Sequence, residues 1–287
     1  MKKFIKYILK KILNAGEKET VADAVQRKKY SILKKFNKKK FTVKDFKESL
    51  VNMGLKKGDT VIVHSAWRSF IGFEGRPQDV IDSIKNIIGE EGNILMPAFT
   101  DNFEVFKYND KSCAGVITEV FRNNKDVQRS LNNMFSMCAY GKKSTLYLSE
   151  HIDSNYCFDD KSPYYKATQD DAKILLLGLG KKPHKITLFH CASYALKDKL
   201  SYYKNVYSYK KNVTIYDQNN KKINKAIIDR LPNFQNDKSK FRYLFKRNMK
   251  YVKYKKINLL DIYLFESKKV YNDVYDYILK SNYKIYK

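Results

Sequence analysis

The sequence is poor in the residues that mark several classes of protein. It has four cysteines in 287 residues and no CxxC pair, which disfavours a disulfide framework and a zinc site of paired ligands. No segment approaches the roughly 18 consecutive apolar residues that a membrane-spanning helix needs. Lys6, Lys10 and Lys11 interrupt the apolar N-terminus, so it does not match a signal peptide. We therefore expect a cytoplasmic protein with reduced thiols and no bound metal.

Acidic residues and glycine are unevenly distributed. Lys and Arg outnumber Asp and Glu by 12 in residues 1–59 and by 15 in residues 197–287. In residues 60–196 the basic and acidic residues are equal in number. All 11 glycines lie at or before Gly180. The basic ends attract anions and repel cations.

A module that binds nucleic acid or a membrane through charge alone is an alternative, but it leaves the neutral centre unexplained. No nucleic-acid fold signature is present, so we expect no nucleic-acid partner.

The N-terminus predicts a separate helical segment. Apolar residues recur at helical spacing over residues 1–13 with lysines on the opposite face, and a second basic helical stretch covers about residues 20–40. Helices like the first lie on anionic membranes, and packing against the domain or a second subunit of a homodimer is the alternative. We predict an extension at 1–41 and one domain at 42–287. That domain comprises a motif-bearing core at 42–200 and a basic portion at 201–287.

From Thr42 onward the pattern alternates helix and strand. Apolar strands are predicted at 61–64, 94–96 and 174–177, with helices at about 42–53, 77–88 and 116–121 and from about 187. Strands at 213–216 and 251–254 look antiparallel or edge-like, and a helix ends the chain. The fold class is therefore α/β, a single domain with a mainly parallel or mixed central sheet flanked by helices. Ligands of such folds lie beyond the carboxyl ends of the strands, here after His64, Met96 and Leu177.

Three segments carry candidate chemistry. Residues 64–75, HSAWRSFIGFEG, offer small side chains and open amides that suit an anion or an extended polar cofactor, although an ordinary strand-to-helix loop has the same pattern. Residues 187–193, TLFHCAS, place His190 where a neutral imidazole could accept a proton from an amine, or where it is simply a core histidine. Residues 149–164 are acidic and form either a solvated loop or a site for a cationic amine. The candidate substrate-binding residues there are His151, Asp153, Asp159 and Asp160.

Five blocks in register resemble the aminoglycoside (antibiotic) 3-N-acetyltransferase family. They are GDTVIVHSAWRSFIGFEGRPQDVIDSI, GNILMPAFT, GVITEVFRNNKDVQRS with FSMCAYG after it, HIDSNYCFDDKSPYYK, and KILLLGLG with TLFHCAS. The resemblance covers about residues 42–200. It implies an acyltransferase of the EC 2.3.1 class that uses acetyl-CoA, with an α/β fold unrelated to the commoner acetyltransferase superfamily.

The same resemblance assigns residues to the site. His190 matches the catalytic histidine of the family. The residues placed on or near coenzyme A are His64, Ser65, Arg68, Ser69, Phe70, Gly72, Thr100, Glu119, Arg129 and Ser130.

Three departures from the family pattern accompany these matches. Asn132-Asn133 stand where the family usually has His-Pro, Ser193 stands where it has Glu, and residues 181–184 replace an Asp. Two carboxylates that could orient the imidazole or bind the substrate are thus absent, which leaves open a non-catalytic coenzyme A-binding homologue.

The resulting hypothesis is direct acetylation of an amino-sugar amine, with His190 as general base. The basic ends favour an anionic, nucleotide-linked or lipid-linked acceptor and hence a role in surface polysaccharide synthesis. Inactivation of aminoglycoside antibiotics is the alternative.

Overall fold

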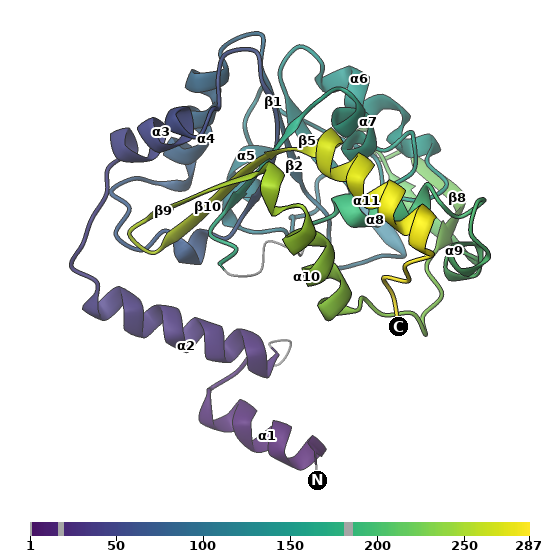
Figure 1. Ribbon diagram of the computed structural model, residues 1–287, viewed down its shortest axis with the longest axis horizontal. Helices are drawn as coiled ribbons and strands as arrows, with labels where there is room; N and C mark the ends of the chain where they lie inside the picture. The colour runs from purple at the N-terminus through teal and green to yellow at the C-terminus, as the bar shows by residue number, and fades with distance from the viewer. Residues whose placement is uncertain (1, 17–19, 181–185) are drawn as a thin grey trace.

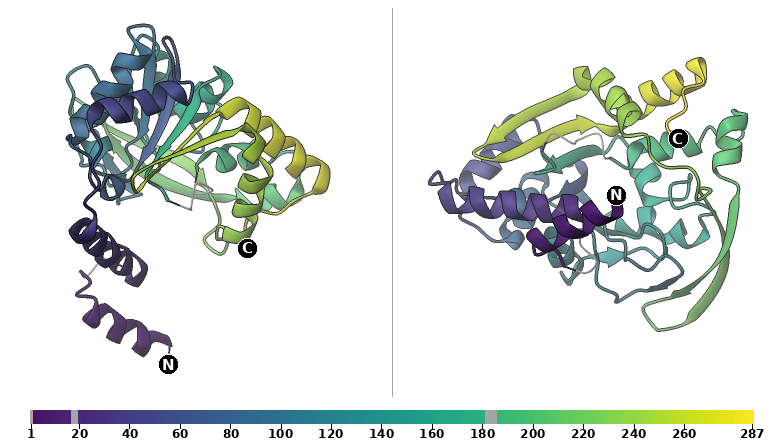
Figure 2. Two further views of the ribbon diagram at one scale, coloured as in Figure 1. Left: turned by 60° about the vertical axis from the view of Figure 1, so that its left-hand side comes forward. Right: turned by 90° about the horizontal axis from the view of Figure 1, so that it is seen from below.

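The computed structural model describes residues 2–16, 20–180 and 186–287 and shows an α/β body with two helices outside it (Figure 1). Those two helices, α1 (Lys2–Ile12) and α2 (Val21–Phe36), stand apart from the sheet in Figure 1 and in the left view of Figure 2. The side chains of Ile5, Ile8, Leu9 and Ile12 on α1 are 40–63% exposed. Among the described residues, no helix is both long enough and apolar enough to cross a bilayer. The predicted membrane contact of residues 1–13 stays a prediction.

The main sheet has three parallel strands at its centre. In the described part of the chain its order is β4-β5-β2-β1-β6-β10-β9. The parallel strands are β1 (Thr60–Ser65), β2 (Asn93–Pro97) and β6 (Lys173–Leu177), with β1 between the other two. Antiparallel strands extend both sides: β5 (Met137–Tyr140) and β4 (Gln128–Arg129) beyond β2, and β10 (Leu260–Glu266) and β9 (Val252–Ile257) beyond β6. The predicted mixed α/β sheet is confirmed.

Helices cover both faces of this sheet because its central strands are apolar on both sides. Val61 and Val63 pack on one face with α3 (Val43–Asn52), α4 (Pro77–Ile88) and α5 (Val116–Arg122). Ile62 packs on the other face, which is covered by α6 (Ser144–Leu148), α7 (Pro163–Gln169), α8 (Leu188–Tyr194), α10 (Lys238–Arg247) and α11 (Ser267–Ser281).

Local signals in the sequence set the ends of α3 and α4. Thr42 and Asp45 form a capping box, in which the Asp45 amide donates to Thr42 Oγ1 at 3.1 Å and the Thr42 amide donates to the Asp45 carboxylate at 2.7 Å. Pro77 occupies the first turn of α4, and Gly89 caps that helix at a φ of 66°. These ends lie where the sequence predicts them.

The C-terminal part contributes more sheet than its sequence indicates. A second, smaller sheet joins β3 (Val105–Lys107) to the hairpin of β7 (Tyr209–Tyr216) and β8 (Lys222–Asp229). The sequence analysis missed β8, and it missed β10, which pairs with the central strand β6. The remaining short elements are α9 (Ser201–Val206), η1 (Trp67–Ser69), η2 (Ser149–Asp153) and η3 (Met249–Tyr251).

Candidate active site

The loops that follow β1 and β6 meet at the carboxyl edge of the sheet. The Ala66 amide donates to the Leu177 carbonyl at 2.9 Å, and Ser69 Oγ donates to the Gly178 carbonyl at 2.6 Å. Gly178 has a φ of 74°, and a Cβ there would lie 2.5 Å from Ser69 Cβ. Only glycine allows both the left-handed conformation and this close approach. We call residues 64–72 together with Gly178 the loop side of the site.

A second glycine ties the loop side to the segment before α3. Gly72 has a φ of 82°, and an added Cβ would lie 2.3 Å from the Lys39 carbonyl. The Phe41 amide donates to the Gly72 carbonyl at 2.9 Å. The helix α2 also reaches this loop, because the Tyr30 hydroxyl lies 3.1 Å from Ser69 Oγ. The loop is therefore fixed by a backbone hydrogen bond to Phe41 and by a side-chain contact with Tyr30.

His190 lies in α8 and is half-buried among aromatic rings. The rings of Phe158, Tyr286 and Phe241 have their centroids 5.8, 5.8 and 5.3 Å from the imidazole. From Phe158 the aromatic contacts continue to Phe135 and then to Phe99, which follows β2. A series of aromatic contacts therefore links the imidazole to the segment that follows β2. We call the surroundings of His190 the imidazole side of the site.

Tyr164 connects the two sides. His64 Nε2, at the end of β1, lies 3.1 Å from the Tyr164 hydroxyl. Burial raises the pKa of Tyr164, and a hydrogen bond with the backbone of Leu188, the first residue of α8, opposes that rise. Residues at the end of β1 and at the start of the His190 helix thus share one buried tyrosine.

The imidazole of His190 is neutral at physiological pH. Burial lowers its pKa to about 3, and the positive charge of Arg230 lowers it further. The Arg230 guanidinium lies 4.8 Å from the centroid of the Tyr286 ring. A neutral imidazole keeps a lone pair on one nitrogen, which is what a general base requires. Cys191, beside it, is no nucleophile, because burial raises the pKa of its thiol.

Hydroxyl groups contact both the Nδ1 atom and the backbone carbonyl of His190. His190 Nδ1 lies 2.7 Å from the Tyr286 hydroxyl, which lies 2.6 Å from the Tyr207 hydroxyl. Ser193 Oγ lies 2.5 Å from Tyr207 and 3.0 Å from Tyr286, and it donates to the His190 carbonyl at 3.0 Å. Ser193 thus stands inside the network that holds the catalytic candidate. The sequence analysis missed Tyr207, Arg230 and Tyr286, which no spacing signal connects to His190.

The remaining residues assigned to the loop side are held mainly by packing. Burial lowers the pKa of His64 to about 4. Phe70 is buried against Phe46 and Trp67, and Ser65 is half-buried. Arg68 is exposed, with its guanidinium 5.9 Å from the Tyr30 ring. Of this set, Arg68 has the side chain most open to an anionic ligand.

The polar atoms of Arg129 and Glu119 are engaged within the fold. Arg129 is 5% exposed and donates to the carbonyls of Ala98, Tyr108 and Asp110. These bonds fix the loop after β2 instead of leaving the guanidinium open to a ligand. Glu119 pairs with Arg122 at 2.7 Å and accepts from the Ser112 amide at 2.9 Å. Thr100 Oγ1 donates to the Asn102 carbonyl at 3.2 Å.

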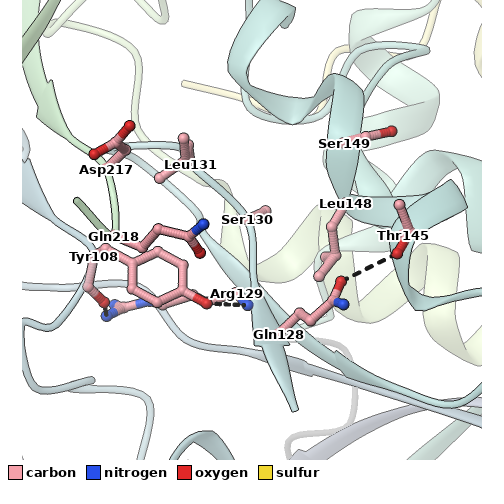
Figure 3. Close-up of a pocket in the computed structure, with 10 residues that line it drawn as sticks. All are labelled: Tyr108, Gln128, Arg129, Ser130, Leu131, Thr145, Leu148, Ser149, Asp217 and Gln218. Atoms are coloured by element: carbon pink, nitrogen blue, oxygen red, sulfur yellow. Dashed lines mark hydrogen bonds between the residues drawn. The ribbon is translucent and has the colours of Figure 1, made fainter. Parts of the chain in front are cut away.

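Ser130 borders a cavity of about 390 Å³ whose lining residues are drawn in Figure 3. Gln128, Thr145, Ser149, Asp217 and Gln218 line it with polar groups, and neither His190 nor His64 contributes to it. Ser130 Oγ itself lies 2.8 Å from His151 Nδ1 and accepts from the Met137 amide at 2.8 Å. The cavity therefore has no imidazole in its lining, and we do not assign the chemistry to it.

The acidic segment splits into buried and exposed residues. His151 is 1% exposed, and burial is the main cause that lowers its pKa to about 3. The Asp159 carboxylate accepts from the amides of Asn155, Tyr156 and Lys161, so it organises its own turn. Asp153 and Asp160 are exposed. The residue of this segment that contacts His190 is Phe158.

Metal ligands do not gather in the described ranges 2–16, 20–180 and 186–287, where no group of three or more His, Cys, Asp or Glu residues could hold an ion. The segment 181–184, which replaces the Asp of the family pattern, lies outside the described residues.

The mixed sheet carries a glycine-shaped loop at the carboxyl edge of its parallel strands, the edge where α/β proteins commonly hold their ligands. The family model described as aminoglycoside 3-N-acetyltransferase matches residues 62–278. The chain belongs to this family.

Individual relatives agree with the family model. The chain is 28% identical over 181 residues to the SPbeta prophage-derived aminoglycoside N(3')-acetyltransferase-like protein YokD of Bacillus subtilis, covering 54% of this chain and 65% of that protein. It is 26% identical over 152 residues to aminoglycoside N(3)-acetyltransferase IV of Salmonella, covering 52% of this chain and 57% of that protein. The chain thus spans less than two thirds of the length of these relatives.

Solved structures support the fold. The structure of AAC-IIIb as a binary complex with CoASH superposes with a TM-score of 0.68 at 17% identity, covering 84% of this chain and 97% of that chain. At this identity the likeness supports the fold alone.

Proposed function

We propose that the protein transfers the acetyl group of acetyl-CoA to the amine of an amino sugar, with His190 as the general base. The observation that carries the proposal is the neutral, half-buried imidazole of His190, on a helix whose first residue shares Tyr164 with His64 at the end of β1. A family relationship to aminoglycoside 3-N-acetyltransferases and the CoASH complex of AAC-IIIb support the donor.

The loop side suits the donor. Gly178 and Gly72 leave no side chain where the backbone turns, and Arg68 lies exposed beside them. Backbone amides that approach a ligand closely, with one cation at the rim, match an extended anionic molecule such as coenzyme A. Acetyl-CoA supplies an activated acyl group as a thioester.

The imidazole side suits proton transfer. The amine nitrogen forms a bond to the thioester carbon, and its proton passes to the unprotonated nitrogen of His190. The C–S bond then breaks, and the imidazolium returns the proton to the leaving sulfur. No redox partner or metal is needed for this balance. A positioned base of this kind contributes roughly 10²–10⁴-fold in rate.

Charge favours an anionic acceptor, such as a nucleotide-linked or lipid-linked amino sugar, and hence a role in surface polysaccharide synthesis. Residues 197–287 carry an excess of 15 basic residues, and Arg230 lies beside the imidazole side. Aminoglycosides are polycations, which such a surface repels. Antibiotic inactivation is the second candidate, favoured by the similarity to aminoglycoside N(3)-acetyltransferase IV.

Thiol release from acetyl-CoA, measured across amino-sugar nucleotides and aminoglycosides, tests the proposal. We expect turnover with the nucleotide sugars and a loss of roughly 10²–10⁴-fold in kcat for His190→Ala, with coenzyme A affinity unchanged. Near wild-type turnover in His190→Ala would show that His190 is not the base. Turnover only with aminoglycosides would select the second candidate, and coenzyme A binding without turnover on any amine would indicate a non-catalytic homologue.

A further inference from the structure

We infer that Tyr286 is the positioning residue of His190, holding its Nδ1 as a donor so that Nε2 carries the lone pair. The inference rests on the proposed role of His190 as base. Position 193 is a serine, so it offers no carboxylate that could orient the imidazole. The inference assigns this orienting role to Tyr286 in the C-terminal region.

Contact geometry fits this role. The Tyr286 hydroxyl lies 2.7 Å from His190 Nδ1, and the two rings are stacked at an interplanar angle of 15°. Tyr286 is 2% exposed, so water does not compete for its hydroxyl. The Nε2 atom of His190 has no hydrogen-bond partner among the described residues, which leaves it open to a substrate.

The backbone around Tyr286 is fixed on both sides. Its carbonyl accepts from the Tyr202 hydroxyl at 2.8 Å. The next residue, Lys287, exchanges two backbone hydrogen bonds of 2.8 Å with Gln235, and the Ile285 carbonyl accepts from the Asp237 amide at 3.1 Å. The hydroxyl is therefore held in place by the chain itself and not by the imidazole alone.

Counting protons in the hydroxyl network favours one tautomer. The network has five contacts. Ser193 Oγ contacts the His190 carbonyl at 3.0 Å, the Tyr207 hydroxyl at 2.5 Å and the Tyr286 hydroxyl at 3.0 Å. The Tyr286 hydroxyl also contacts the Tyr207 hydroxyl at 2.6 Å and His190 Nδ1 at 2.7 Å. The serine and the two tyrosines supply three protons.

His190 can supply a fourth proton. If Nδ1 is protonated, four of the five contacts contain a hydrogen, and these include the three shortest. If Nδ1 is only an acceptor, three of the five contacts contain one. The protonated form fills one more buried contact, which favours it. In that form the network runs from the imidazole through Tyr286, Tyr207 and Ser193 back to the His190 carbonyl.

Tyr286→Phe tests the inference, because it removes one oxygen and keeps the ring. Tyr283→Phe is the matched control: it lies three residues away, and its hydroxyl bonds no group in the described part of the protein. The first readout is the ¹⁵N spectrum of the histidine rings in the free protein, with His190 assigned from the signals lost in His190→Gln. We expect protonated Nδ1 and bare Nε2 in the wild type and in Tyr283→Phe, and a shift toward the other tautomer in Tyr286→Phe.

The second readout is turnover with acetyl-CoA and the best acceptor. Misplacement of a catalytic group typically costs up to about 10²-fold, so we expect kcat of Tyr286→Phe to fall about tenfold to hundredfold. The KM for acetyl-CoA and the fold, checked by circular dichroism, should match those of Tyr283→Phe. A general loss of structure would change KM as well.

The outcomes separate the two proposals. A wild-type spectrum with protonated Nε2 overturns the positioning role, whatever the substrate is. An inactive His190→Ala beside a fully active Tyr286→Phe also overturns it and leaves the general base intact. An active His190→Ala overturns the base, and the tautomer measured in the free protein then still decides whether Tyr286 sets the proton on the imidazole.

Discussion

The loop side and the imidazole side of the site are built in different ways. On the loop side, positive φ angles at Gly72 and Gly178 and backbone contacts within 3 Å set the shape, so few sequences can form it. On the imidazole side, the shape comes from side chains of Phe158, Tyr207 and Tyr286, far apart in the sequence. Backbone-defined geometry leaves a recognisable motif, whereas geometry defined by side-chain contacts can be reached from many sequences. The two halves of the candidate site can therefore diverge at different rates.

The largest expected effect concerns the histidines, of which His64 belongs to the loop side and His190 to the imidazole side. Burial lowers the folded-state pKa to about 4 for His64 and about 3 for His190 and His151. The unfolded chain binds protons near pH 6.5, so stability is full above that pH and falls as the pH drops toward 4. Each histidine contributes up to about 1.4 kcal/mol per pH unit.

Urea unfolding at pH 7, 6 and 5 measures this slope. His64→Gln and His190→Gln should each reduce the pH dependence of the unfolding free energy by up to about 1.4 kcal/mol per pH unit, the contribution of one proton. A smaller reduction would mean that the histidine is partly exposed in the folded protein. A slope that responds to only one of the two variants would show that burial differs between the two sides.

The next prediction concerns the close contact between Gly178 and Ser69 on the loop side. Gly178→Ala should destabilise the protein by about 2–4 kcal/mol, because a left-handed alanine costs about 1–2 kcal/mol and the clash with Ser69 adds a similar amount. Gly58→Ala is the matched control, since its φ is 80° but nothing lies within 4 Å of an added Cβ. Coenzyme A affinity should fall only in Gly178→Ala. Equal unfolding free energies for the two variants would contradict the importance of this contact.

The smallest effect tests the charge on the imidazole side. Arg230 has no ion-pair partner in the part of the chain that the structure describes, and its guanidinium lies over Tyr286. Arg230→Gln should raise the KM for an anionic acceptor about threefold to tenfold, as one partly screened charge allows. The KM for acetyl-CoA should stay unchanged. Arg247→Gln, which removes a guanidinium that pairs with Asp273 at 3.1 Å, serves as the control. Equal changes in both variants would assign the effect to net charge alone.

The body of the fold was accessible from the sequence because its signals are local. The cap at Thr42, Pro77 at the start of α4 and the apolar runs of β1, β2 and β6 each act within a few residues. The strand β10 was missed because its apolar residues follow a basic, glycine-free stretch that resembles a surface segment.

The site was accessible only in part. The strand ends and His190 could be placed from the alternation of elements and the family resemblance. The contact of Tyr286 with His190 could not, since 96 residues separate them and no periodicity connects them. Arg129 shows what the family resemblance alone could not reveal. The resemblance assigns it to the coenzyme groove, but only the structure shows its guanidinium bonded to the carbonyls of Ala98, Tyr108 and Asp110.

The position of β10 has a consequence for how the protein folds. β6 receives β1 on one edge and β10 on the other, so its two neighbours lie about a hundred residues away in each direction along the chain. A fragment that ends near residue 200 contains the five sequence blocks of the family resemblance but leaves the hydrogen-bonding edge of β6 bare, and bare edges promote aggregation. Such long-range pairings also slow folding. We therefore expect the five blocks to need the C-terminal part of the chain in order to fold.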